Sequence, residues 1–211
     1  MEVFISTDSR GATPGPKHTW ISLFKAQHPE FHCEVPACVN FTSIFEQFPK
    51  MLFTNKVFDF LIVQNGYHDM IVPWKSCVYK QKLPQYDPYW DRHLIPFPDQ
   101  NIGNHEFRGC YHYQDDEMIR KMFRLIRQKC RKIVFIQCPF TWEAFVERTQ
   151  VMNKLFGECA DAVIEMPQDA DFPKRCTPYT DTDRVHYLDA FAQELSDMVY
   201  KKLNGILKET C

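Results

Sequence analysis

The sequence predicts a three-layer α/β/α sandwich built on a doubly wound, five-stranded parallel sheet. Five apolar runs rich in β-branched or aromatic residues are too short for helices and nearly continuous in hydrophobicity, as strands covered on both faces are. Helical patterns alternate with these runs, which favours right-handed crossovers and helices on both faces of one sheet. With 211 residues, of which 45% are hydrophobic, the chain can bury a large core. We therefore expect a single domain over residues 1–211.

The predicted strands and helices follow one another along the chain. The strands are expected at Glu2–Ser6, Cys33–Val39, Val57–Gln64, Lys132–Cys138 and Ala162–Met166. The helices are expected at His18–His28, Ser43–Asn55, Asp115–Cys130, Thr141–Glu158 and Tyr187–Leu207. Each helical segment carries apolar residues at helical spacing, and the third also has acids at its start and bases at its end, as the helix dipole prefers.

Residues 71–113 fit none of these elements. The stretch is rich in proline and in aromatic side chains, and so many aromatic residues argue against disorder. We expect an ordered insertion that overhangs the functional site. The alternative is a packed insertion that only shields an edge of the sheet.

Charge and cysteine content exclude several classes of protein. The chain has 25 basic and 27 acidic residues, so it lacks the basic surface that binds nucleic acid or an anionic membrane. It has no apolar run long enough to span a membrane and no signal-peptide pattern, which predicts a cytoplasmic protein, or a secreted one if a leader was removed. Nine cysteines without CxxC pairs indicate free thiols in a reducing compartment.

We expect neither a cofactor nor a metal ion. The sequence has no glycine-rich phosphate loop of the kinds that bind nucleotides. Two groups of histidine and cysteine residues lack the spacing of a zinc site. These groups are His28, His32, Cys33 and Cys38, and His105, Cys110 and His112.

Two polar segments carry residues suited to nucleophilic catalysis. The first strand runs into Thr7-Asp8-Ser9-Arg10-Gly11, where the serine either caps a turn or acts as a nucleophile at the carboxyl edge of the sheet. A serine needs a base to remove its proton, most often a histidine oriented by a carboxylate. Asp183 and His186, three residues apart before the last helix, are suited to these two roles.

The order of three short blocks resembles that of the SGNH, or GDSL-type, hydrolase family. The Gly-Asp-Ser block after strand one corresponds to Thr7-Asp8-Ser9. The Gly-x-Asn-Asp block after strand three corresponds to Gly66-Tyr67-His68-Asp69, and the Asp-x-x-His block before the last helix corresponds to Asp183-Arg184-Val185-His186. The resemblance implies the flavodoxin-like SGNH fold over the whole chain.

The resemblance to this family also implies a role for each matched residue. Ser9 would be the nucleophile, His186 the general base and then the acid, and Asp183 the group that orients His186. Gly66 and Asp69 would shape the third loop.

Three positions depart from the family pattern. Thr7 replaces the glycine of the first block, and His68 stands where the family has an asparagine that helps to hold the oxyanion. An imidazole N–H can donate one hydrogen bond to that oxygen, although His68 can equally be a structural loop residue. The glycine of the second block has no counterpart, and Asn40 is our candidate for its role. The backbone N–H of Ser9 is the remaining oxyanion donor that the resemblance implies.

Two further residues have a simpler interpretation beside the functional one. Arg10 either binds an anionic group of the substrate or is a solvated loop charge. His186 is either the base or a water-exposed residue at the start of a helix.

The leading hypothesis is a serine esterase that hydrolyses a short acyl ester, with acetyl as the expected acyl group, of a carbohydrate or other small molecule. The aromatic insertion would form the pocket for the acceptor. One alternative is a catalytically weakened or inactive relative that binds a glycan or a protein, and another is an O-acyltransferase. Acyl length, the alcohol and the oligomeric state are left open by the sequence.

Overall fold

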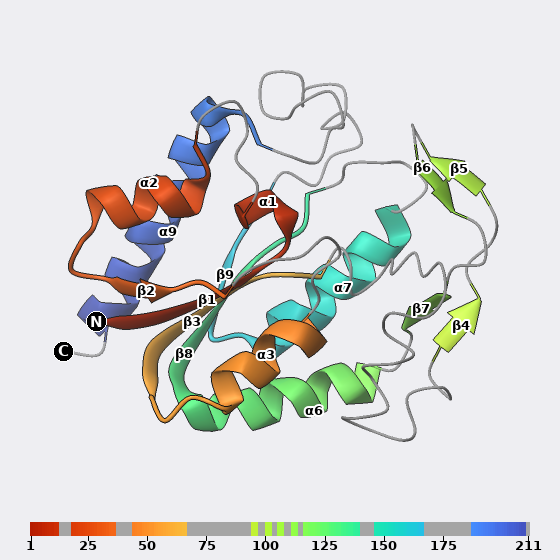
Figure 1. Cartoon of the computed structure of the whole chain (residues 1–211), viewed down its shortest axis with the longest axis horizontal. Helices are drawn as coiled ribbons and strands as arrows, with labels where there is room; N and C mark the ends of the chain where they lie inside the picture. Colours follow the sequence, from red (N-terminus) through yellow and green to blue (C-terminus); the bar gives the residue numbers. More distant parts are fainter. Residues whose placement is uncertain are drawn as a thin grey trace.

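Five parallel strands form the central sheet of the protein, which we describe from a computed structural model (Figure 1). The structure describes residues 1–12, 18–36, 44–66, 94–96, 100–102, 105–107, 111–113, 116–139, 146–166 and 187–209. The strands are β1 (Glu2–Thr7), β2 (His32–Glu34), β3 (Phe58–Gln64), β8 (Cys130–Ile136) and β9 (Ala162–Ile164). Their order in the sheet is β2-β1-β3-β8-β9. The chain therefore reverses direction across the sheet between β1 and β3, which is where α/β proteins of this order bind ligands.

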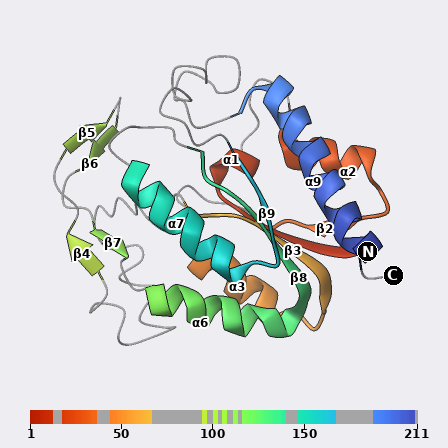
Figure 2. The same ribbon diagram turned by 180° about the vertical axis from the view of Figure 1, so that it is seen from behind.

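Helices cover both faces of the sheet, as Figures 1 and 2 show from opposite sides. On one face lie α2 (Trp20–Gln27) and α9 (Asp189–Glu209), and on the other lie α3 (Ile44–Leu52), α6 (Asp116–Ile126) and α7 (Val146–Cys159). Val3 and Ile5 of β1 pack in the core beneath α2 and α9, whereas Phe4 packs in the opposite core. Both faces of β1 are thus buried, as its continuous hydrophobicity requires. The predicted three-layer sandwich with five parallel strands is confirmed.

Three predicted boundaries around β8 were wrong. The helix expected to reach Cys130 ends at Ile126, and a single 3₁₀ turn, η3 (Arg127–Lys129), follows it. Cys130 has an extended backbone (φ −144°, ψ 151°) and begins β8, two residues before the predicted start. The apolar spacing of α6 continues into the first residue of the strand, so the pattern does not mark the change. The strand ends at Ile136, not at Cys138.

Three other predicted ends were also wrong: α3 ends at Leu52 and not at Asn55, β9 ends at Ile164 and not at Met166, and β2 ends at Glu34 although residues 35 and 36 are described. The remaining described boundaries agree within one or two residues. β2 covers only the first part of the predicted Cys33–Val39 run, and residues 37–39 lie outside the described residues. The described part of α7 begins at Val146, and residues 141–145 of the predicted helix also lie outside.

Residues 71–113, which fit none of the predicted elements, contain regular structure within their described part. Four short strands lie there: β4 (Leu94–Pro96), β5 (Gln100–Ile102), β6 (His105–Phe107) and β7 (Tyr111–Tyr113). β4 pairs with β7 and β5 with β6, both antiparallel. Leu94 pairs with Tyr113 and Ile102 with His105, so the two ladders keep the same register. The two residues between β5 and β6 are Gly103 and Asn104, a dipeptide that is typical of two-residue hairpin loops.

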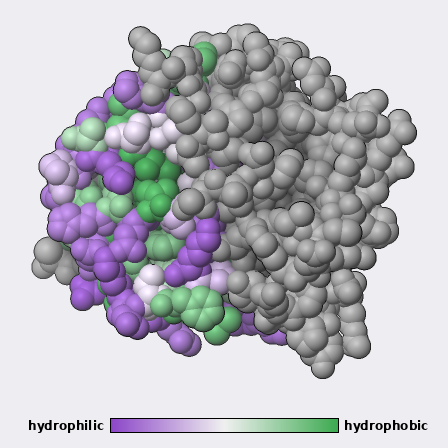
Figure 3. Space-filling view, in the orientation of Figure 1, coloured by the Kyte–Doolittle hydropathy of each residue, from purple (hydrophilic) through white to green (hydrophobic). Residues whose placement is uncertain are grey.

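Hydrophilic residues dominate the described surface in the space-filling view, with apolar residues in separate patches (Figure 3). The large exposed apolar side chains among the described residues are Phe53, Val57, Leu125 and Val151. No helix within the described ranges is both long and apolar enough to cross a membrane.

Candidate active site

Ser9 lies where the sequence predicts it, at the carboxyl edge of the sheet. β1 ends at Thr7, which pairs with Gln64 at the end of β3, and the short helix α1 (Ser9–Ala12) begins two residues later. Ser9 therefore follows the strand that borders the topological switch point. Thr7 has the extended backbone of a strand, which readily accepts a β-branched residue in place of the family's glycine.

A buried ion pair flanks Ser9. The Arg10 Nη2 atom lies 2.6 Å from Asp8 Oδ2, and the Arg10 Nε and backbone N–H groups both donate to Asp8 Oδ1, at 2.9 and 3.0 Å. Arg10 is only 2% exposed and Asp8 is fully buried. Burial is the largest single effect and lowers the pKa of the Arg10 guanidinium, but the opposing effects of its neighbours, Asp8 first among them, together outweigh burial and raise that pKa above its ordinary value. The interpretation of Arg10 as a solvated loop charge was wrong.

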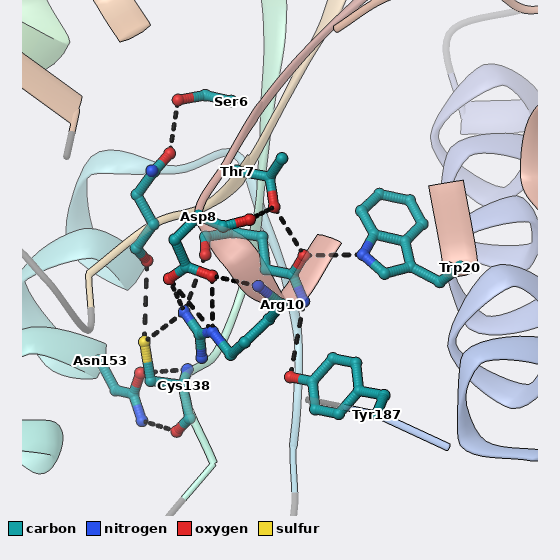
Figure 4. A network of polar contacts seen from close by, with 10 residues as sticks. Ser6, Thr7, Asp8, Arg10, Trp20, Cys138, Asn153 and Tyr187 are labelled. Carbon is teal, nitrogen blue, oxygen red and sulfur yellow. Dashed lines mark hydrogen bonds and ion pairs between the residues drawn. The ribbon is translucent and has the colours of Figure 1, made fainter. Parts of the chain in front are cut away.

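Arg10 also links three strands at this edge (Figure 4). Its Nη2 donates to the backbone carbonyl of Gln64 at 2.8 Å and contacts the Cys138 Sγ atom at 3.4 Å. Gln64 ends β3, and Cys138 follows β8 by two residues. The segment that carries Ser9 is therefore fixed to the carboxyl ends of β3 and β8.

The side chain of Gln64 joins three more parts of the fold. Its Oε1 atom accepts hydrogen bonds from Thr7 Oγ1 at 3.0 Å and from Trp20 Nε1 at 2.7 Å. Its Nε2 donates to the Tyr187 hydroxyl at 3.5 Å, a long bond. Burial raises the pKa of Tyr187 well above its ordinary value, so this hydroxyl stays protonated. The contacts bring β1, α2 and the segment before α9 to one buried amide.

The start of the third loop is held from two sides. Asn65 accepts a hydrogen bond from the Ser6 hydroxyl, and the Cys138 thiol lies 3.7 Å from the Asn65 carbonyl oxygen. The Asn153 amide of α7 bonds both the backbone N–H and the carbonyl of Cys138, at 2.8 and 2.9 Å. Gly66 follows with a φ of 123°, a conformation that glycine adopts without strain. The predicted role of Gly66 in shaping this loop remains a prediction, now with a backbone conformation that supports it.

The close packing of the α1 backbone against two side chains explains why residue 11 is a glycine. A Cβ atom at this position would lie 2.3 Å from Thr7 Oγ1 and 2.6 Å from Gln64 Oε1. Glycine therefore lets α1 pack directly on the polar cluster.

The other predicted site residues lie outside the described residues. They are Asn40, His68, Asp69, Asp183 and His186. The structure does describe Tyr187, the residue directly after His186, and places it against the polar cluster. The roles assigned to these five residues, and the substrate-binding role of Arg10, remain predictions. Within the described ranges, no group of three or more histidine, cysteine or acidic residues could hold a metal ion.

Sequence reasoning missed the buried polar residues around the segment that carries Ser9. These are Gln64, Trp20, Cys138, Asn153 and Tyr187. One signal was present, since Gln64 is a polar residue directly after the apolar run Phe60-Leu61-Ile62-Val63. A buried amide requires partners, but nothing in the sequence says which ones.

Comparison with solved structures identifies the fold. A lipase/acylhydrolase from Enterococcus faecalis matches 97% of this chain over 95% of its own, at 12% identity and a TM-score of 0.60. Axe2, an acetylxylan esterase from Geobacillus stearothermophilus, matches 95% of this chain over 92% of its own, at 12% identity and a TM-score of 0.53. The α/β hydrolase LAE5, from the metagenome of Lake Arreo in Spain, matches 94% of this chain over 92% of its own, at 15% identity and a TM-score of 0.56.

The chain has the SGNH hydrolase fold. The resemblance of the three sequence blocks is thereby confirmed at the level of the fold. No protein-family model matches the chain, and no curated protein matches its sequence. An SGNH fold at such low identity marks a divergent sequence, so activity and substrate must be argued from the residues.

Proposed function

We propose that this protein is a serine esterase of the SGNH type, with Ser9 as nucleophile, His186 as general base and Asp183 as the carboxylate that orients His186. The fold supports a hydrolase, because solved structures similar to it are acylhydrolases and esterases. The position of Ser9 beside the switch point supports its assignment as the nucleophile.

One observation carries the proposal: Thr7 and Tyr187 share Gln64 as a hydrogen-bond partner. Thr7 lies two residues before Ser9, and Tyr187 directly follows His186. Two segments nearly 180 residues apart in the sequence therefore approach each other at the carboxyl edge of the sheet. This approach is what a serine and a histidine from opposite ends of the chain need to form a catalytic pair.

The proposed reaction is acyl transfer to water in two steps. His186 removes the proton of the Ser9 hydroxyl as its oxygen attacks the ester carbonyl, and then donates that proton to the leaving alcohol. His186 next removes a proton from water, whose oxygen attacks the acyl-enzyme and releases the acid and free Ser9. The backbone N–H of Ser9, Asn40 and His68 are the proposed donors to the oxyanion.

A short acyl ester of a carbohydrate or other small molecule is the proposed substrate. An acetylxylan esterase among the similar structures supports this choice. The aromatic residues of the insertion at 71–113 are proposed to form the acceptor pocket.

Hydrolysis of p-nitrophenyl acetate by wild type and by Ser9→Ala tests the proposal. We expect the substitution to lower kcat by at least about 10³-fold, since removal of a nucleophile costs this much or more in serine hydrolases. Ser22→Ala is a matched control, because Ser22 is exposed at the start of α2 and its hydroxyl bonds Thr19 within the described part of the chain. Equal activity of Ser9→Ala and wild type would contradict the proposal. Inactivity of wild type toward this ester and toward acetylated sugars would favour the binding module instead.

A further inference from the structure

We propose that Gln64 is a positioning residue, whose side-chain amide sets the position of the Ser9 segment relative to the His186 segment. This inference rests on the proposed function. Gln64 is fully buried and lies in the last position of β3, between the strand that leads to Ser9 and the segment that follows His186.

The orientation of the amide follows from its partners. The indole N–H of Trp20 can only donate a hydrogen bond, so the atom that it contacts at 2.7 Å must be the Gln64 oxygen. The Thr7 hydroxyl donates to the same oxygen at 3.0 Å. The Gln64 nitrogen then faces Tyr187, whose hydroxyl accepts from it.

Each bond constrains a different part of the fold. The Thr7 bond fixes the end of β1, and the backbone carbonyl of Gln64 accepts from Arg10, so Gln64 holds the chain on both sides of Ser9. Trp20 is fully buried in the core beneath α2 and α9 and holds the amide oxygen in place. The 3.5 Å bond to Tyr187 is the longest of the set. Among these contacts, the bond to Tyr187 is therefore the weakest constraint.

A glutamine at this position fits a positioning role better than a packing role. Phe60, Leu61, Ile62 and Val63 precede it in β3, and an apolar side chain would continue this pattern without a requirement for buried partners. An apolar residue would, however, leave the Trp20 N–H and the Thr7 hydroxyl without this acceptor. It would also remove the only described side-chain hydrogen bond between β3 and Tyr187. A small displacement of a nucleophile from its base can cost about 10²-fold in rate.

Gln64→Met tests the proposal, because methionine keeps the length of the side chain and removes both polar atoms. We expect kcat for p-nitrophenyl acetate to fall by about 10- to 100-fold while KM stays near the wild-type value. The rate of inactivation by a fluorophosphonate should fall in parallel, since it reports the reactivity of Ser9. Phe24→Leu, a core substitution in α2 outside the cluster, controls for stability and should lower the melting temperature without lowering kcat.

Tyr187→Phe gives a second, milder test if Gln64→Met does not fold. It removes one hydroxyl and keeps the ring packed on Phe191, whose centroid lies 4.9 Å away. We expect a several-fold loss of kcat, and a combined Gln64→Met, Tyr187→Phe variant no slower than Gln64→Met alone.

The two proposals fail in different ways. If wild type is active through Ser9 but Gln64→Met and Tyr187→Phe both keep the wild-type kcat, the positioning role is wrong and the esterase proposal stands. If Ser9→Ala keeps the wild-type activity, the esterase proposal itself is wrong. If Phe24→Leu loses as much kcat as Gln64→Met, Gln64 acts as an ordinary core residue and the positioning role is wrong.

Discussion

The Arg10 guanidinium lies 2.6 Å from the Asp8 carboxylate in the interior of the protein, and the two residues flank Ser9 in the sequence. Neither charge reaches solvent, so each depends on the other for stabilisation. The pair is accordingly part of the scaffold beneath Ser9.

Arg10→Met should strongly destabilise the protein, because it leaves the Asp8 carboxylate buried without its partner. We expect the free energy of unfolding in urea to fall by about 3–5 kcal/mol. Adding Asp8→Asn to this variant should recover part of the loss, since no buried charge then remains. Arg131→Met is the matched control, because Arg131 pairs with Asp59 while 76% exposed and should cost no more than about 1 kcal/mol. A similar small loss for Arg10→Met would contradict the buried pair.

Alanine substitutions at two glycines should change stability in opposite directions. At Gly11 the new Cβ atom would collide with Thr7 Oγ1 and Gln64 Oε1, and we expect a loss of about 1–3 kcal/mol. At Gly205, in α9, nothing lies within 4 Å of the new atom. Alanine is the better helix former there and should add about 0.5–1 kcal/mol. Thermal unfolding of the two variants checks both signs, and a stabilised Gly11→Ala would refute the close packing of α1.

Gly66→Ala should strain the start of the third loop. Its φ of 123° is unfavourable for residues with a side chain, and its Cβ would lie 3.2 Å from Cys138 Sγ. We expect a loss of about 1–3 kcal/mol in urea unfolding. Combining it with Cys138→Ala should relieve only the contact with sulfur, because the backbone strain remains. Complete recovery in this double variant would show that packing, and not φ, is the constraint.

Stability should fall at alkaline pH because of the Cys130 thiol. Burial raises the pKa of this thiol from 9.0 to about 12 in the folded state. The folded pKa is thus above the unfolded one, so the folded protein binds more protons between the two values. The contribution of the protonated Cys130 thiol to the free energy of unfolding is fully present below pH 9 and is lost progressively as pH rises toward 12.

Urea unfolding of wild type and Cys130→Ala at several pH values isolates this effect. The difference in unfolding free energy between the two proteins should stay constant up to about pH 8.5 and shrink by about 1 kcal/mol near pH 10. A difference that does not vary with pH would show that the folded thiol titrates normally.

The strands and the location of Ser9 could be predicted from the sequence because both depend on local patterns. Continuous apolar runs mark buried parallel strands, and the break after β1 falls at the edge where such sheets present functional groups. The burial of Arg10 could not be predicted in this way. Asp-Ser-Arg-Gly has the composition of an exposed turn, and only the contacts with Gln64 and Cys138 show that Arg10 is buried.

The role of Gln64 depends on contacts that no local pattern encodes. Its partners Thr7, Trp20 and Tyr187 lie 57, 44 and 123 residues away in the sequence. By contrast, the hairpin of β5 and β6 has a local signal in Gly103-Asn104, which the density of aromatic and proline residues around it obscured.

The most direct test of the central claim is to identify the residue that a fluorophosphonate modifies. We predict one adduct per chain, located by peptide mass spectrometry on Ser9 and absent from His186→Ala but present in His32→Ala, which changes an exposed histidine of β2. An adduct on another residue, or no adduct on a folded protein, would contradict the assignment of Ser9 as a nucleophile activated by His186.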